Sequence, residues 1–354
     1  MKLLDSSTYK ADLKRAIESS NLSELDGKSI FITGGLGLIA SSIVDVLFVY
    51  GKIGKIYVGA RNEEEFRRRF GNYEKVEFVQ YDALEKMKLN FKPDYIIHGA
   101  GLASPELYVS MPVETVLSNF NGIHELLEYA RNNKVRKLLY VSSSEVYGKK
   151  NTDGPFIEGN YGEIDIDNIR SSYAVAKRAS EMLCKAYFSE YGVNATIVRP
   201  GHIYGPSAKK SDKRISSDFA FKAAMGERLE MKSPGLQKRS YCYSIDCALQ
   251  ILKVLLKGQG GQAYNIGSDE VTTIREMAEI YAKAGNVEAI ISNPTEEEKK
   301  AFNPMNNSSL DNSKIKRLGY RQVFSVEEGL THTVEILKEM IEGSEKNWGD
   351  TNCI

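Results

Sequence analysis

Short apolar runs alternate with longer segments of helical spacing between residue 27 and about residue 206. Six of the runs are predicted to be buried strands: 29–33, 55–60, 76–81, 94–100, 137–143 and 194–200. Helical patterns separate several of them, including 112–132 and 172–191. Strands that alternate with helices require right-handed crossovers, so the pattern predicts an α/β fold with a doubly wound parallel sheet.

Two regions flank this pattern. Residues 7–25 have helical spacing of Leu13, Ile17 and Leu22, which predicts a short helical extension packed on the body or on a partner. After residue 206 the rhythm is less regular and predicts a second, smaller lobe interleaved with the end of the first. Its expected elements are a helix at 217–226, an extended segment at 229–244, a strand at 263–268 and a helix at 273–284.

The composition is that of an ordinary globular protein, with 42% hydrophobic and 27% charged residues among 354. The formal net charge is zero, so overall charge does not predict binding to nucleic acid or to an anionic membrane. Four scattered histidines and four cysteines without paired spacing predict neither a metal site nor a disulfide framework. Without a membrane-spanning run or a secretory signal, the expected location is the cytoplasm.

A glycine-rich segment, TGGLGLIA at 33–40, lies between the first strand and an apolar helix. Gly34 and Gly37 permit a tight turn and close approach of a pyrophosphate to the helix N-terminus, and Ala40 stands at the third position of the motif. This context predicts dinucleotide binding, with Leu38 and Ile39 in the first helical turn beside the cofactor.

The end of the second strand bears on the choice of dinucleotide. NAD-binding sheets usually place Asp or Glu there, whereas this chain has Arg61 and Asn62. A guanidinium could pair with a 2′-phosphate, so Arg61 favours NADP over NAD; alternatively, Arg61 stacks on adenine or faces solvent. Asp82, after the third strand, is expected to receive the adenine amino group or to serve as a plain turn residue.

Tyr173 and Lys177 are four residues apart on a predicted helix and therefore share one face. Of the 20 tyrosines, only Tyr173 has a lysine at this spacing. The pKa of a free phenol, about 10, is too high for a base at neutral pH, and a neighbouring ammonium would lower it. An exposed helix pair is the alternative, but the dinucleotide motif upstream favours catalysis.

The segment VSSSEVYG at 141–148 places Glu145 directly after three hydroxyl residues, where an apolar strand ends. A solvated turn and an active site both explain this arrangement.

Taken together, the glycine-rich turn, SSSEVYG and Tyr173-x-x-x-Lys177 resemble an extended short-chain dehydrogenase/reductase of the nucleotide-sugar epimerase/dehydratase family, over about residues 27–340. The resemblance implies a Rossmann domain, a nucleoside-diphosphate-sugar substrate, and a tightly bound nicotinamide cofactor that is recycled through a 4-keto intermediate. It implies Ser143, Tyr173 and Lys177 as catalytic residues. The further residues expected at the cofactor are Ala100 and Asn119, and those expected at the substrate are Ser104, Ser144, His202, Arg214 and Arg239.

Within this family the chain is most similar to UDP-glucuronate decarboxylases, through 103–122, 143–148 and 212–219. Dehydratases usually have Asp-Glu after the catalytic Thr or Ser, and simple epimerases need no carboxylate. Here Glu145 follows Ser144, as in decarboxylases, so the resemblance implies that Glu145 is a fourth catalytic residue. The chain departs from the family at His202, where Asn is usual before YGP, and in the glycine-rich turn at Leu36, Leu38 and Ala40. The alternatives to decarboxylation are 4-epimerisation, 4,6-dehydration, reduction of a keto sugar by NADPH, and a non-catalytic dinucleotide-binding role.

The resemblance also implies a homodimer formed by helices 112–132 and 172–191. The apolar residues expected between subunits are Val116, Ile123, Leu127, Met182, Leu183 and Tyr187. The predicted domain boundaries are an N-terminal extension at 1–26, a dinucleotide-binding domain at 27–206 with a return segment at about 238–268, a substrate lobe at 207–237 and 269–342, and a loose tail at 343–354.

Overall fold

A seven-stranded parallel sheet forms the centre of the computed structural model, which describes residues 2–150, 153–295 and 306–349. The strand order is β11-β6-β5-β4-β1-β2-β3, and every neighbouring pair is parallel. The strands are β1 (Ser29–Thr33), β2 (Lys55–Ala60), β3 (Val76–Gln80), β4 (Tyr95–His98), β5 (Lys137–Val141), β6 (Ala195–Pro200) and β11 (Ala263–Ile266). This topology confirms the predicted doubly wound α/β fold.

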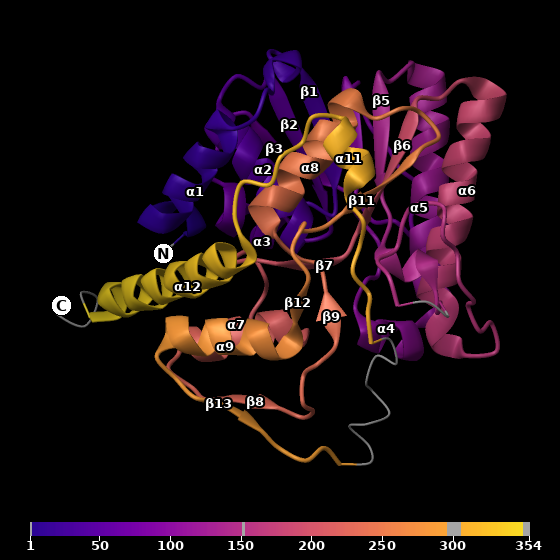
Figure 1. The fold of residues 1–354 in the computed structure, drawn as a ribbon. Coiled ribbons are helices and arrows are strands. Elements are labelled where there is room, and N and C mark those ends of the chain that lie inside the picture. The colour runs from indigo at the N-terminus through magenta and orange to yellow at the C-terminus, as the bar shows by residue number, and fades with distance from the viewer. Residues whose placement is uncertain (1, 151–152, 296–305, 350–354) are drawn as a thin grey trace.

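The side chains of β1 alternate between two apolar layers, one on each face of the sheet. Ile30 and Ile32 belong to a core that includes α2 (Leu38–Tyr50) and α8 (Ser244–Lys257). Phe31 packs into a second core with α5 (Pro112–Asn133) and α6 (Ser172–Tyr191), which lie side by side in Figure 1. Strands buried on both faces by helices explain the continuous apolar runs in the sequence.

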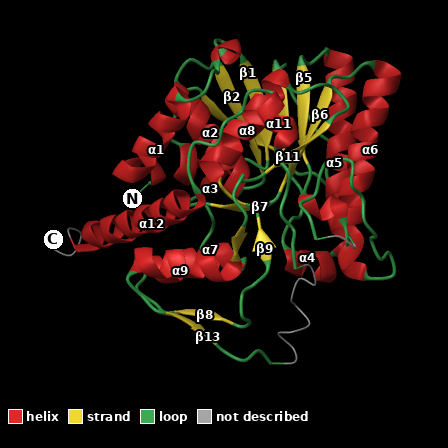
Figure 2. Cartoon of the chain, in the orientation of Figure 1, coloured by secondary structure: helices red, strands yellow, loops and turns green. Residues whose placement is uncertain are grey.

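A smaller lobe lies beyond the carboxyl ends of the strands, at the bottom of Figures 1 and 2. Its elements are α7 (Ile215–Ala224), α9 (Ile274–Gly285), β8 (Leu229–Met231) and β13 (Ala289–Ile291). Two short strand pairs, β7 (His202–Tyr204) with β10 (Tyr241–Tyr243) and β9 (Lys238–Arg239) with β12 (Thr272–Thr273), lie between the lobe and the sheet. The remaining elements are α1 (Ser7–Glu18), α3 (Glu63–Phe70), α4 (Pro105–Ser110), α11 (Ser313–Arg317), α12 (Val326–Gly349) and the 3₁₀ turns η1 (Leu3–Asp5), η2 (Ser23–Leu25), η3 (Ser144–Tyr147) and η4 (Ile169–Ser171).

The N-terminal helix α1 packs against α2, α8 and α12, and Leu13 is fully buried. It ends at Glu18, earlier than the helical spacing over 7–25 predicts. At the other end of the chain, residues 343–349 continue α12 instead of forming the expected loose tail.

Strands β4 and β5 end at His98 and Val141, earlier than the apolar runs predict. The residues that follow leave the sheet and form turns at its carboxyl edge, where ligands bind in open α/β folds.

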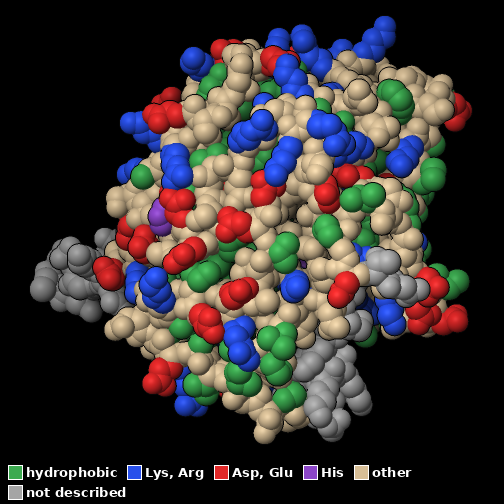
Figure 3. Space-filling model, viewed as in Figure 1, with side chains coloured by type: hydrophobic (Ala, Val, Ile, Leu, Met, Phe, Trp, Pro, Cys, Tyr) green, Lys and Arg blue, Asp and Glu red, His purple; other side chains and the backbone are tan. Residues whose placement is uncertain are grey.

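Figure 3 shows acidic and basic side chains interspersed over the visible face of the molecule. Among the described residues, no helix is long and apolar enough to cross a membrane.

Candidate functional site

The glycine-rich turn joins β1 to α2 and touches the end of β4. Gly34 has a φ of +70°, and a Cβ atom there would lie 2.8 Å from the main chain of Gly99 and Ala100. Gly37 caps α2 and donates its N–H to the carbonyl oxygen of Gly34 at 2.9 Å. The sequence analysis missed Gly35, where a Cβ would lie 2.3 Å from Cγ1 of Val58. The glycine-rich turn therefore packs its main chain directly against the main chain after β4. It leaves the N-terminus of α2 available, and Leu38, Ile39 and Ala40 form the first helical turn there. An accessible helix N-terminus of this kind fits a pyrophosphate.

The end of β4 is fixed by polar contacts to β1 and α5. Thr33 Oγ1 lies 2.7 Å from His98 Nδ1 and accepts the N–H of Ala100 at 3.2 Å. Asn119 is fully buried on α5, and its Nδ2 donates to the carbonyl oxygens of Leu102 and Thr115 at 3.2 and 2.8 Å. Asn119 thus holds the turn that carries Ala100.

Arg61 and Asp82 follow β2 and β3 at the same edge of the sheet. Arg61 is exposed, and its carbonyl oxygen accepts Nε2 of Gln80 at 3.4 Å. Asp82 Oδ1 accepts the N–H of Leu84 at 2.9 Å, so the aspartate forms the turn considered as the plain alternative for it.

Tyr173 and Lys177 are buried on α6, facing the end of β5. The Nζ of Lys177 donates to the carbonyl oxygen of Val141 at 2.8 Å and lies 5.6 Å from the centroid of the Tyr173 ring. Burial raises the pKa of Tyr173 to about 12, while its hydrogen bond with Ser143 opposes this rise. Burial lowers the pKa of Lys177 to about 7. Desolvation thus outweighs the expected lowering of the pKa of the phenol by the ammonium.

A second tyrosine, Tyr108 on α4, stacks on Tyr173 with ring centroids 4.4 Å apart and ring planes at 8°. Its hydroxyl donates to the carbonyl oxygen of Ala103 at 3.0 Å. The sequence analysis missed Tyr108, although it lies within the quoted segment 103–122.

Glu145 lies in the 3₁₀ turn η3, whose main chain is tied to Ser143. The N–H of Glu145 donates to Ser143 Oγ at 3.2 Å. Its carboxylate lies 3.5 Å from Nη1 of Arg170, and the charge of Glu145 raises the pKa of Tyr173. The sequence analysis also missed Arg170, which stands three residues before Tyr173. The structure thus brings a carboxylate, a hydroxyl and a phenol together at the end of β5.

Three candidate substrate residues lie beside this group. Arg239 on β9 is buried, which lowers its pKa, while the charge of Glu145 raises it. Burial, together with the charges of Arg239 and Arg214, lowers the pKa of His202 to about 3, so this imidazole is neutral. Arg214 is at the start of α7 and donates Nε to Asp212 at 2.9 Å.

The two candidate serines differ in position. Ser144 is half-buried within η3. Ser104 is exposed at the start of α4, and the described contacts do not link its side chain to Glu145 or Tyr173.

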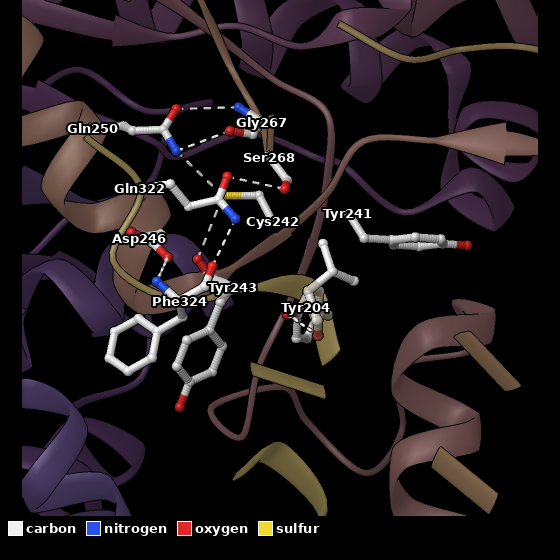
Figure 4. Close-up of a pocket in the computed structure, with 11 residues that line it drawn as sticks. Tyr204, Tyr241, Cys242, Tyr243, Asp246, Gln250, Gly267, Ser268, Gln322 and Phe324 are labelled. Atoms are coloured by element: carbon white, nitrogen blue, oxygen red, sulfur yellow. Dashed lines mark hydrogen bonds between the residues drawn. The ribbon is translucent and has the colours of Figure 1, made fainter. Parts of the chain in front are cut away.

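A cluster of buried side chains lies apart from this group, where the return segment meets the start of α12 (Figure 4). The carboxylate of Asp246 there accepts the hydroxyl of Tyr320 at 2.5 Å and the N–H groups of Val323 and Phe324 at 3.0 Å. Burial raises the pKa of Asp246 to about 6. These bonds tie the segment before α12 to α8, so we assign this cluster a structural role.

The set of residues expected between subunits requires a correction. Ile123, Leu127 and Tyr187 are buried inside the chain's own core, because they face the sheet from α5 and α6. Leu183 also packs against this core, whereas Val116 and Met182 are exposed.

The doubly wound sheet, the glycine turn and the buried Tyr–Lys pair define an enzyme that uses a nicotinamide dinucleotide. A sequence profile of the NAD dependent epimerase/dehydratase family matches residues 30–267, and the chain belongs to this family. This confirms the family predicted from the sequence.

Known relatives include UDP-glucuronic acid decarboxylase 1 of Xenopus tropicalis, 28% identical over 333 residues, which are 92% of this chain and 76% of the relative. UDP-glucuronic acid decarboxylase 6 of Arabidopsis thaliana is 32% identical over 255 residues, which are 71% of this chain and 72% of the relative. The crystal structure of the UDP-glucose 4-epimerase from Thermus thermophilus in complex with NAD matches with a TM-score of 0.74 and 25% identity, over 88% of this chain and 99% of that one.

Proposed function

We propose that the protein decarboxylates a uronic acid linked to a nucleoside diphosphate, by transient oxidation at C4 of the sugar. One observation carries the proposal: Glu145 donates its N–H to Ser143 Oγ at 3.2 Å, and both residues lie close enough to the buried Tyr173 to shift its pKa. A carboxylate beside the oxidation site has a role in decarboxylation, whereas rotation of a ketone in a 4-epimerase needs none. The similarity to UDP-glucuronic acid decarboxylases supports the same choice.

The residues of the glycine turn fit a dinucleotide, since a Cβ at Gly34 would fill the space against β4. Gly34, Gly37 and the first turn of α2 would hold the pyrophosphate, and Arg61 and Asp82 would face the adenosine. When bound, the nicotinamide supplies a hydride acceptor that later returns the hydride. We propose a tightly bound, recycled cofactor, with Arg61 favouring NADP.

In this proposal Tyr173 accepts the proton of the C4 hydroxyl as a phenolate, assisted by Ser143. The positive charges of Lys177 and of the bound nicotinamide would offset the rise in the pKa of Tyr173 that burial causes. The resulting 4-keto acid breaks its C5–C6 bond, carbon dioxide leaves, and the electron pair moves to the C4 oxygen as an enolate. Glu145 then passes a proton from solvent to C5, which converts the enolate back to a ketone, and the proton held by Tyr173 returns to the C4 oxygen when the ketone is reduced. Arg239 binds the carboxylate or diphosphate of the substrate, because a guanidinium suits both groups.

The test is incubation of the purified protein with a panel of nucleoside-diphosphate sugars, followed by mass spectrometry and NMR of the products. Carbon dioxide and a nucleotide-linked pentose are expected from a uronic acid. Conversion of neutral sugars at C4 alone would instead support a 4-epimerase. Tyr173→Phe should abolish every conversion, because the group that accepts the hydroxyl proton is removed.

We further propose a homodimer formed through α5 and α6. Their exposed apolar side chains include Val113, at 62% exposure, and Met182, at 64%. Exposed apolar patches of this kind commonly mark subunit interfaces. Light scattering at micromolar concentration tests this, and a monomer would contradict it.

The described cysteines, Cys184, Cys242 and Cys247, are buried free thiols, so we place the protein in a reducing compartment such as the cytoplasm.

A further inference from the structure

Arg178 follows Lys177 on α6 and donates to three main-chain carbonyl oxygens. Its Nε donates to Val146 at 2.6 Å, and its Nη2 donates to Tyr147 at 3.2 Å and to Gly162 at 2.8 Å. Val146 and Tyr147 belong to η3, the turn that carries Glu145. A rigid, planar guanidinium suits this task, because its donors have a fixed geometry.

The third carbonyl belongs to a segment that runs back along the turn. The N–H of Gly162 donates to the carbonyl oxygen of Tyr147 at 2.7 Å, and Lys149 and Glu163 exchange hydrogen bonds at 2.8 and 2.9 Å. Gly148 has a φ of +65°, and a Cβ there would lie 2.2 Å from the carbonyl oxygen of Glu163. Arg178 therefore holds the turn and the segment packed against it at the same point.

A second guanidinium nearby has a different role. Arg199 is fully buried, and it donates to Glu181 at 2.9 and 2.6 Å and to the hydroxyl of Tyr147 at 3.1 Å. Removing Arg199 would leave a buried carboxylate unpaired, which is strongly destabilising. Arg178 is half-buried, and within the described part of the chain it forms no ion pair with a carboxylate. Its loss leaves carbonyl oxygens, not a buried charge, so positioning and stability can be separated at Arg178.

We propose that Arg178 is a positioning residue for Glu145. It fixes the peptide groups immediately after Glu145 to α6, the same helix that presents Tyr173 and Lys177, so the carboxylate is held in register with the phenol. This inference rests on the proposed function, in which Glu145 acts after oxidation of the sugar. Arg178 touches neither Ser143 nor Tyr173 in the described contacts, so it affects the second step and leaves the first intact.

The experiment compares Arg178→Ala with Arg178→Lys, with Glu145→Gln, and with Lys185→Ala as a control two turns further along α6. Cofactor reduction on mixing with a nucleotide-linked uronic acid measures the first step, and carbon dioxide release measures the second. Arg178→Ala should reduce cofactor at nearly the wild-type rate, whereas product formation falls by about a hundredfold and a keto intermediate accumulates, as in Glu145→Gln. Arg178→Lys should remain impaired, because an ammonium lacks the planar fork, and added guanidinium should partly restore Arg178→Ala.

Hydrogen exchange provides a readout besides activity. In Arg178→Ala the amides of Val146, Gly148 and Gly162 should exchange faster, while those of β5 keep their protection; Lys185→Ala should change neither. Any one of three results for Arg178→Ala would overturn the proposal. These are an equal loss of both steps, product formation at the wild-type rate, and unchanged exchange at the three amides. If the wild-type protein converts no uronic acid, the proposed function is wrong, and the exchange data still decide whether Arg178 fixes the turn.

Discussion

Two turns at the carboxyl edge of the sheet prepare the site in different ways. The glycine turn after β1 is shaped by main-chain contact, since Gly34 approaches Gly99 and Ala100 too closely for a side chain. The turn after β5 is shaped by polar groups, with Ser143 bonding the N–H of Glu145 and Arg178 bonding the carbonyls behind it. The first turn is therefore set by close packing of the main chain, whereas the second also depends on a donor, Arg178, that reaches it from α6.

The largest effect should come from adding one carbon to the first turn. Gly34→Ala places a Cβ 2.8 Å from the main chain of Gly99 and Ala100, so the turn must move and cofactor binding should be lost. Gly27→Ala is the matched control, because Gly27 has a similar φ of +66° but no atom within 4 Å of the added Cβ. The control should lose about 1 kcal/mol of stability from the left-handed backbone alone and bind cofactor normally. Calorimetric titration measures the affinity, and equal affinities of the two variants would show that contact with β4 is unimportant.

The second turn should respond to a change of charge. Glu145→Gln preserves size, so oxidation of the sugar should continue, while product formation falls by about a hundredfold or more. Rapid mixing should show reduced cofactor and a persistent keto sugar. Tyr173→Phe is the contrasting variant, because it should block cofactor reduction itself. A Glu145→Gln protein that forms normal product at the normal rate would remove the carboxylate from the mechanism and favour 4-epimerisation.

The difference between the turns also explains what could be predicted from the sequence. The fold and the glycine turn follow from local spacing, because Gly34, Gly37 and the strand and helix around them are adjacent in the chain. Tyr173 and Lys177 are likewise one helical turn apart. Arg170, Arg178 and Tyr108 were missed because their roles depend on where segments meet: Tyr108 stacks on Tyr173 across 65 positions of sequence.

The sequence also could not predict which apolar residues of α5 and α6 face the sheet and which face solvent. Their apolar residues outnumber the positions on one face, and the sequence pattern does not indicate which of them face the sheet. Ile123 and Leu127 were expected at a subunit interface but lie in the core, whereas Val113 and Leu117 are exposed. The packing of both helices against the sheet determines which of these residues are buried.

A smaller effect is expected at the adenosine end of the proposed cofactor site. Arg61→Ala should weaken NADP by about tenfold, equivalent to about 1.4 kcal/mol, and leave NAD almost unchanged, because only NADP carries a 2′-phosphate. Arg67→Ala on α3 is the control, since Arg67 is exposed and pairs with Glu63. Competitive titration with both dinucleotides measures the ratio. Equal affinity for NAD and NADP in the parent protein, unchanged in Arg61→Ala, would contradict the role given to Arg61.

The smallest effect concerns a polar contact outside both turns, between α1 and α12. Nδ1 of His332 lies 2.9 Å from a carboxylate oxygen of Asp12, and this hydrogen bond raises the pKa of His332. Asp12 also accepts the hydroxyl of Tyr243 at 2.9 Å, and Glu335 and Glu328 raise the pKa of His332 further.

Because the pKa of His332 is higher in the folded state, the folded protein binds this proton more tightly than the unfolded chain does. The resulting stability is fully present below the unfolded pKa of about 6.5 and is lost as the pH rises through the folded pKa. His332→Gln and Asp12→Asn should therefore both flatten the fall in melting temperature on the alkaline side of pH 6.5. Either variant retaining the full pH dependence would show that the contact contributes nothing.

Both variants should carry out cofactor reduction and product formation at the wild-type ratio of rates, because the contact between His332 and Asp12 lies in neither turn. A selective loss of the step assigned to Glu145 would instead mean that the second turn is positioned through the whole lobe, and not locally by Arg178.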